Sequence, residues 1–123
     1  MDELRRPASP VKFDRPHQRW LPPRVSRWSA LLAAPTAPLQ VRSLGYRWGS
    51  CSERGALNLH WAVMQLPPIL IDYVLVHELA HLHVPNHSPE FWRCVARGLP
   101  DFEARRSDLE GWGASIWLPE HTD

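Results

Sequence analysis

The sequence is poor in cysteine, in long apolar runs and in net charge. Its two cysteines, Cys51 and Cys94, are too few for the disulfide framework of a small secreted domain. No segment approaches the roughly 18 consecutive apolar residues of a membrane-spanning helix. No apolar stretch of the signal-peptide kind follows the N-terminus. We therefore expect a cytoplasmic protein that does not associate with membranes.

Charges of opposite sign nearly balance, with 14 Lys and Arg against 13 Asp and Glu. The overall composition therefore does not favour nucleic acid as a partner. The distribution is uneven, because residues 1–27 hold seven basic and three acidic residues, whereas residues 100–123 hold two and six. The basic N-terminal segment permits contact with nucleic acid without requiring it. The 123 residues, 44% of them hydrophobic, fit one globular domain.

Proline and histidine are abundant and clustered. Seven of the 13 prolines fall within residues 1–40, and prolines at this density interrupt helices and sheets. The pattern predicts an extended Pro/Arg-rich arm over residues 1–23 and a folded domain over residues 24–123. Four of the seven histidines fall within eleven residues, at His77, His81, His83 and His87.

Hydrophobic periodicity predicts a small sheet after a short helix. Apolar residues at helical spacing favour an amphipathic helix over residues 24–34. A weak alternation predicts a strand over residues 39–43. Two further runs, 46–52 and 57–61, flank a turn at Gly55 and read as a β-hairpin.

The second half of the chain is predicted to be helical. From Ile69 the sequence is apolar on almost every side, which indicates a buried helix that stops before Pro85. Ser88 and Pro89 are typical of an N-cap and a first helical residue, so a helix is expected up to Gly98. A last helix is expected from about residue 102 to 109 or slightly beyond.

The buried helix carries the motif His77-Glu78-Leu79-Ala80-His81. Residues four apart share a helix face, so both imidazoles can reach one metal ion. Glu78 lies about 100° around the helix from the first ligand, where it can take a proton from a metal-bound water. Two histidines and a glutamate would be costly to bury without partners. The motif therefore predicts a metal site with Glu78 as its acid/base.

A catalytic zinc needs a third protein ligand. His87 follows His81 by six residues, the spacing of the extended H-E-x-x-H-x-x-G-x-x-H pattern, although Val84 replaces the glycine. Glu90 or Glu103 is the main alternative. His83 points away on the same helix and is interpreted as a helix-end residue. Cys94 is interpreted as core packing, and neither cysteine is expected to bind zinc.

Several blocks of the sequence together resemble the YgjP-like metallopeptidase-domain family, which is related to the WLM and SprT-like zinc proteases. They are Tyr46-Arg47-Trp48-Gly49-Ser50-Cys51-Ser52, Leu57-Asn58-Leu59, the segment Ile71 to Leu82, and Pro85 to Trp92. The resemblance implies an α+β fold with a minimal zincin-like core. In that core a small antiparallel sheet packs on an active-site helix, with two further helices. It also implies that His77, His81 and His87 bind Zn²⁺ and that Glu78 is catalytic.

These residues support the hypothesis of a zinc metallopeptidase acting on a peptide or protein substrate. The strand Leu57–Trp61 is the expected sheet edge for an extended peptide. His60 is expected either to face the site, where it would stabilise an oxyanion, or to face solvent. Tyr73 is expected in the core, one helical turn before His77, where it would support that histidine from behind. The acids nearest in sequence for orienting the ligand histidines are Asp72, Glu90, Asp101 and Glu103.

Three other functions remain open. A metal-dependent hydrolase of nucleotide phosphoanhydrides would use arginines near the site, at Arg47, Arg54 and Arg93, to bind phosphate. A DNA-associated protease would use the basic N-terminal arm. A zinc-stabilised binding module would keep the metal without significant turnover.

Overall fold

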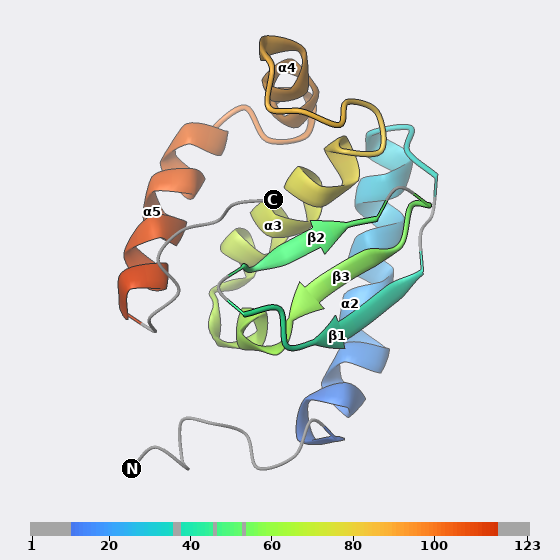
Figure 1. The fold of residues 1–123 in the computed structure, drawn as a ribbon, viewed down its shortest axis with the longest axis vertical. Coiled ribbons are helices and arrows are strands. Elements are labelled where there is room, and N and C mark those ends of the chain that lie inside the picture. Colours follow the sequence, from blue (N-terminus) through green and yellow to red (C-terminus); the bar gives the residue numbers. More distant parts are fainter. Residues whose placement is uncertain (1–10, 36–37, 46, 53, 116–123) are drawn as a thin grey trace.

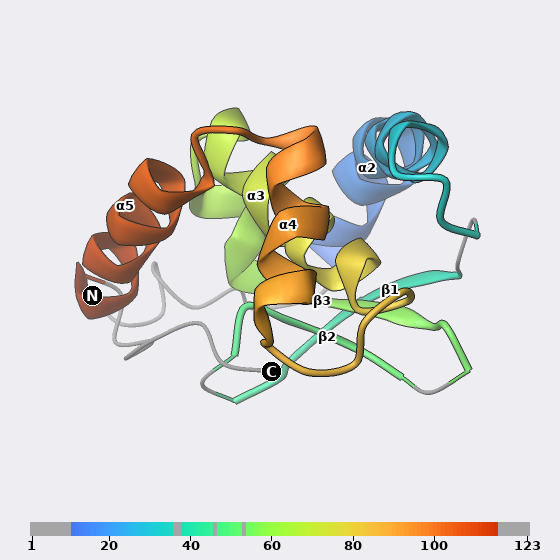
Figure 2. The same ribbon diagram turned by 90° about the horizontal axis from the view of Figure 1, so that it is seen from above.

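The computed structural model describes residues 11–35, 38–45, 47–52 and 54–115. Four helices and three strands make up the regular structure of this part of the chain (Figure 1). In chain order they are α2 (Val11–Leu31), β1 (Leu39–Arg42), β2 (Gly49–Cys51), β3 (Leu57–His60), α3 (Pro68–Ala80), α4 (Pro89–Gly98) and α5 (Phe102–Ser115), with a 3₁₀-helix, η1 (Trp61–Gln65), after β3. The helices lie on one face of the sheet (Figure 2). The expected α+β class is confirmed.

Helix α3 is the centre of the domain and packs against α2, α4, α5 and β2. All eleven residues from Leu70 to Ala80 are buried, as the continuous apolar sequence predicts. Its regular part ends at Ala80, and His81 is the C-cap. Turns over residues 81–83 follow, in which the N–H groups of His83 and Val84 both bond to the carbonyl of Ala80.

The hairpin and the bounds of α4 are confirmed. β2 and β3 pair antiparallel, with Gly49 opposite Leu59 and Cys51 opposite Leu57. α4 begins at Pro89, with Ser88 as the N-cap position, and ends at Gly98. α5 begins at the expected residue and is longer than expected, reaching Ser115. Three helices accompany α3, as the hydrophobic periodicity predicted, whereas the family resemblance implied two.

The expectation of a wholly antiparallel sheet was wrong. The strand order is β1-β3-β2, and β1 pairs parallel with β3, with Leu39 opposite Leu57 and Val41 opposite Leu59. A short turn forces β2 and β3 to be antiparallel, whereas the longer connection after β1 carries the chain to the far side of β3. β3 is consequently the central strand. The segment Leu57–Trp61 is not the sheet edge predicted for peptide binding, and β2 is one of the two outer strands.

The extended arm was also wrong for residues 11–23, because α2 begins at Val11 and runs through the predicted boundary after Pro23. Leu21 is fully buried and starts an apolar stripe that continues, at helical spacing, through Val25, Trp28 and Leu32. Burial of this stripe against the core outweighs the helix-breaking tendency of the prolines. Residues 1–10 of the expected arm lie outside the described residues.

An ion pair joins α2 to α3. Nη1 of Arg24 lies 2.6 Å from Oδ1 of Asp72, and Nη2 of Arg27 lies 3.6 Å from Oδ2. This pairing provides countercharge to a carboxylate on the otherwise apolar α3. In the part of the chain that the structure describes, no helix combines the length and the hydropathy needed to cross a bilayer.

Candidate metal centre

Three imidazoles converge at the C-terminal end of α3. His77 lies in the last turn of the helix, His81 is its C-cap, and His87 comes from the loop between α3 and α4. Nε2 of His87 lies 3.2 Å from Nε2 of His81 and 3.3 Å from Nε2 of His77. His77 is buried, His81 is half-buried and His87 is exposed, so the cluster opens to solvent on the His87 side.

These distances match the geometry of a metal centre. Zinc–nitrogen bonds of about 2.0–2.1 Å in a tetrahedron place two ligand nitrogens about 3.3 Å apart. In the part of the chain that the structure describes, these three histidines form the one group of His, Cys, Asp or Glu side chains suited to a metal ion. Neither Glu90 nor Glu103 belongs to it, and neither cysteine does. The arrangement therefore fits zinc on three histidines.

The protonation of His81 also suits metal binding. Its Nδ1 lies 3.0 Å from the carbonyl oxygen of Val84. A carbonyl can only accept, so Nδ1 must carry the proton, and in the neutral ring Nε2 then presents its lone pair to the cluster. Val84 stands where the extended zinc motif has glycine, and its backbone carbonyl still orients His81.

A tyrosine contacts His77, the first histidine of the cluster. The hydroxyl of Tyr73, one helical turn before His77, lies 3.4 Å from Nδ1 of His77. Tyr73 is buried, so it belongs to the core and also contacts His77. Two of the acids expected near the ligands are engaged elsewhere, because Asp72 pairs with Arg24 and Asp101 pairs with Arg105.

Glu78 is fully buried where α3 meets β2. A Cβ atom placed on Gly49 would lie 3.1 Å from both Cγ and Oε2 of Glu78 and 3.2 Å from the carbonyl oxygen of Asn58. Any larger residue at this position would therefore have to displace Glu78 or the neighbouring backbone by a few tenths of an ångström. This explains part of the Arg47–Cys51 block, whose role the sequence did not reveal.

The same block anchors β2 in the core. Trp48 is fully buried, and its carbonyl accepts a hydrogen bond from the N–H of His60. Cys51 is half-buried on β2, and Cys94 is buried in α4, as expected for packing. Tyr46, which opens the block in sequence, lies outside the described residues.

His60 does not face solvent, and its interactions are structural. It is buried and caps η1, because its Nδ1 accepts a hydrogen bond from the N–H of Ala62 at 3.0 Å. Burial lowers the pKa of His60, and a hydrogen bond with the backbone of Gly45 opposes this effect. His83 is exposed, and its Nε2 lies 2.9 Å from the carbonyl oxygen of Leu32.

Two aromatic residues of α4 form a wall of the site that the sequence analysis did not identify. The ring centroid of Phe91 lies 5.0, 4.4 and 5.0 Å from those of His77, His81 and His87. Trp92 lies 5.8 Å from the His77 ring and 5.9 Å from the His87 ring. Their position soon after His87, at the start of a helix with an N-terminal proline, was the available signal.

Comparison with known proteins gives the family. The family model of the YgjP-like metallopeptidase domain matches residues 13–111. The fold is similar to the crystal structure of the metallopeptidase zymogen of Pyrococcus abyssi abylysin, with a TM-score of 0.70 and 23% identity over 82% of this chain and 97% of that one. A search of curated proteins found no significant match. The match to most of the chain, together with the three converging histidines, shows that the protein belongs to the YgjP-like metallopeptidase-domain family.

Proposed function

We propose that the protein is a zinc-dependent peptidase in which His77, His81 and His87 hold the metal and Glu78 transfers the proton. The observation that carries this proposal is the convergence of three imidazole Nε2 atoms, two pairs of them 3.2 and 3.3 Å apart. Membership of a metallopeptidase family supports the peptide as substrate. When bound, zinc would lower the pKa of a coordinated water and polarise the scissile carbonyl.

The protein's own residues supply positioning and proton transfer. The Val84 carbonyl fixes the His81 tautomer, and Phe91 packs on the rings of all three histidines. A carboxylate oxygen of Glu78 takes the proton of the attacking water and passes it to the nitrogen of the leaving amine. Burial between α3 and β2 restricts where that carboxylate can lie.

The sheet offers a place for an extended peptide. β2 is an outer strand, it packs against α3, and Gly49 within it approaches Glu78. A peptide added alongside β2 would therefore run past the buried glutamate and the histidine cluster. In this proposal β2 replaces the central strand β3 as the peptide-binding edge.

Substitution of Glu78 separates chemistry from metal binding. Glu78→Gln should retain one zinc per chain and lose turnover of a casein-type peptide about 100- to 10 000-fold, the range for a general acid/base. Unchanged activity would refute the role of Glu78. Nucleotide phosphate release, measured in parallel with the same variant as control, tests the alternative substrate class. Zinc without turnover of either substrate would favour a binding module.

The ligand set has a matched control within the same segment. His87→Ala should lose zinc by elemental analysis, because it removes one of the three converging nitrogens. His83→Ala should keep zinc, because the imidazole of His83 contacts the Leu32 carbonyl instead. Full zinc retention in His87→Ala would overturn the proposed ligand set.

A further inference from the structure

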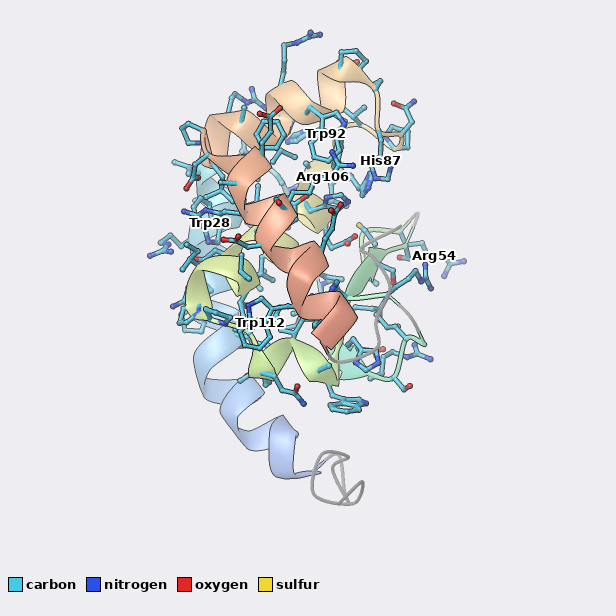
Figure 3. All side chains as sticks on the ribbon, turned by 90° about the vertical axis from the view of Figure 1, so that its left-hand side faces the viewer. Trp28, Arg54, His87, Trp92, Arg106 and Trp112 are labelled. Atoms are coloured by element: carbon cyan, nitrogen blue, oxygen red, sulfur yellow. The ribbon has the colours of Figure 1, made fainter. Side chains whose placement is uncertain are left out.

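Trp92 connects the candidate metal centre to a cation on α5. Its half-buried ring is stacked with the ring of His87 at 5.9 Å and with that of Phe102 at 5.3 Å. The guanidinium carbon of Arg106 lies over Trp92, 4.8 Å from the ring centroid. Phe102 and Arg106 are four residues apart on α5 and so share one helix face. Figure 3 shows the side chains of Trp92, His87 and Arg106 gathered at one place.

The charge of Arg106 is not neutralised within the described residues. Arg106 is exposed, and no carboxylate in this part of the chain pairs with it. Its neighbour Arg105 differs, because it binds both oxygens of Asp101 and the carbonyl of Ile69. Stacking on tryptophan holds a guanidinium in place and leaves its N–H donors at the edge, in the fork that matches a carboxylate.

The position of Arg106 limits what it can reach. The guanidinium carbon lies 4.8 Å from the Trp92 ring centroid, and the His87 ring lies 5.9 Å from it. The guanidinium is therefore no more than about 11 Å from the His87 ring. An extended chain spans about 3.3–3.6 Å per residue. The guanidinium is therefore within about three residues of a peptide bond held at the histidine cluster.

We propose that Arg106 is a specificity-determining residue that binds a carboxylate of the substrate within about three residues of the cleaved bond. The carboxylate is either an Asp or Glu side chain or the C-terminus of the peptide. The location of the cleaved bond rests on the proposed function. Trp92 positions the guanidinium and at the same time contacts the ligand His87.

The test compares substrates and variants in one matrix. The peptides share one core sequence and carry Glu or Gln at each of the three positions on either side of the cleaved bond, with the C-terminus free or amidated. The zinc-loaded proteins are the unsubstituted chain, Arg106→Gln, Arg106→Lys and Arg93→Gln. Arg93 is the matched control, because it is an exposed arginine on α4 that lines a groove together with Glu90 and Arg97.

We expect Arg106→Gln to lower kcat/KM about five- to tenfold for peptides with the recognised carboxylate and to leave their neutral counterparts unchanged. Arg106→Lys should retain part of the preference, and Arg93→Gln all of it. Loss confined to peptides with a free C-terminus identifies the terminal carboxylate, and loss confined to a Glu position identifies a side chain. Equal loss on neutral peptides, or a lower Tm with unchanged preference, would overturn the proposal.

A binding measurement keeps the inference independent of turnover. Zinc-loaded Glu78→Gln, with and without Arg106→Gln, is titrated against the same peptides carrying a neutral fluorophore. Arg106→Gln should weaken the binding of only those peptides that carry the recognised carboxylate, again about five- to tenfold. Absence of cleavage by the unsubstituted protein would count against the proposed peptidase, whereas identical anisotropy curves for the Glu and Gln peptides would count against Arg106.

Discussion

Replacing Gly49 with alanine tests whether β2 positions the Glu78 carboxylate. The new methyl carbon would lie 3.1 Å from Cγ and Oε2 of Glu78 and 3.2 Å from the Asn58 carbonyl oxygen. Non-bonded carbons are at their optimum about 3.5–4.0 Å apart, so the methyl is several tenths of an ångström too close to its neighbours. Asn58 belongs to the central strand, which is paired on both sides. The group that yields is therefore the Glu78 side chain.

Two magnitudes follow from this contact. Overpacking of this kind costs about 1–3 kcal/mol, which corresponds to a fall in Tm of about 4 °C for each kcal/mol in a domain of this size. A displacement of about 1 Å at a reacting group can cost about 100-fold in rate. We expect a smaller shift of Glu78, and hence a fall in kcat of about 10- to 100-fold, while the zinc content stays that of the unsubstituted protein.

The assay measures kcat for peptide cleavage, zinc content and Tm on the same preparations. Gly111→Ala is the matched control, because a Cβ there meets nothing within 4 Å. That substitution lies in α5, should raise helix stability by about 0.5–1 kcal/mol and should leave kcat unchanged. Full activity of Gly49→Ala with normal zinc would refute the positioning role. Parallel loss of zinc and activity would show that the substitution acts through the ligands.

Two further predictions concern stability. Asp72→Asn removes the carboxylate that pairs with Arg24 at 2.6 Å. Urea titrations should show a free energy of unfolding about 1–3 kcal/mol lower. If the same substitution costs as much in a protein that already carries Arg24→Gln, the pairing is contradicted. The pKa of His60 is lowered in the folded protein, so as the pH falls His60 is protonated in the unfolded chain before it is protonated in the folded one. The folded state therefore loses stability as the pH falls below 6.5, the ordinary pKa of histidine. His60→Asn, which can still cap η1, should lose less stability than the unsubstituted protein between about pH 7.5 and 5.5, and identical pH slopes would contradict this.

Local patterns in the sequence predicted the elements that carry the candidate site. The apolar run of α3, the hairpin around Gly55 and the Ser88-Pro89 helix start all reflect backbone and burial preferences within a few residues. The spacing of His77 and His81 depends only on helix geometry. The tautomer of His81 was not predictable in this way, because it depends on how the turn after α3 places the Val84 carbonyl.

The features that sequence reasoning missed depend on contacts between distant segments. The prolines suggested an extended arm up to residue 23, but Leu21 is buried in the core. The pairing of Arg24 with Asp72 joins residues 48 positions apart. The direction of β1 depends on a connection whose course no alternation pattern encodes. The contact of Gly49 with Glu78 and the stacking of Arg106 on Trp92 likewise exist only once the helices are packed.

The candidate site and the hydrophobic core share the same helix, which determines how substitutions act. Polar groups within buried α3 are contacted from different elements: Arg24 of α2 pairs with Asp72, β2 approaches Glu78 closely at Gly49, and His87 of the following loop lies 3.3 Å from His77. Misplacing any of these elements both destabilises the fold and distorts the site. Exposed residues with other contacts, such as His83 and Arg93, lie outside this arrangement, so their replacement should change neither stability nor zinc content appreciably.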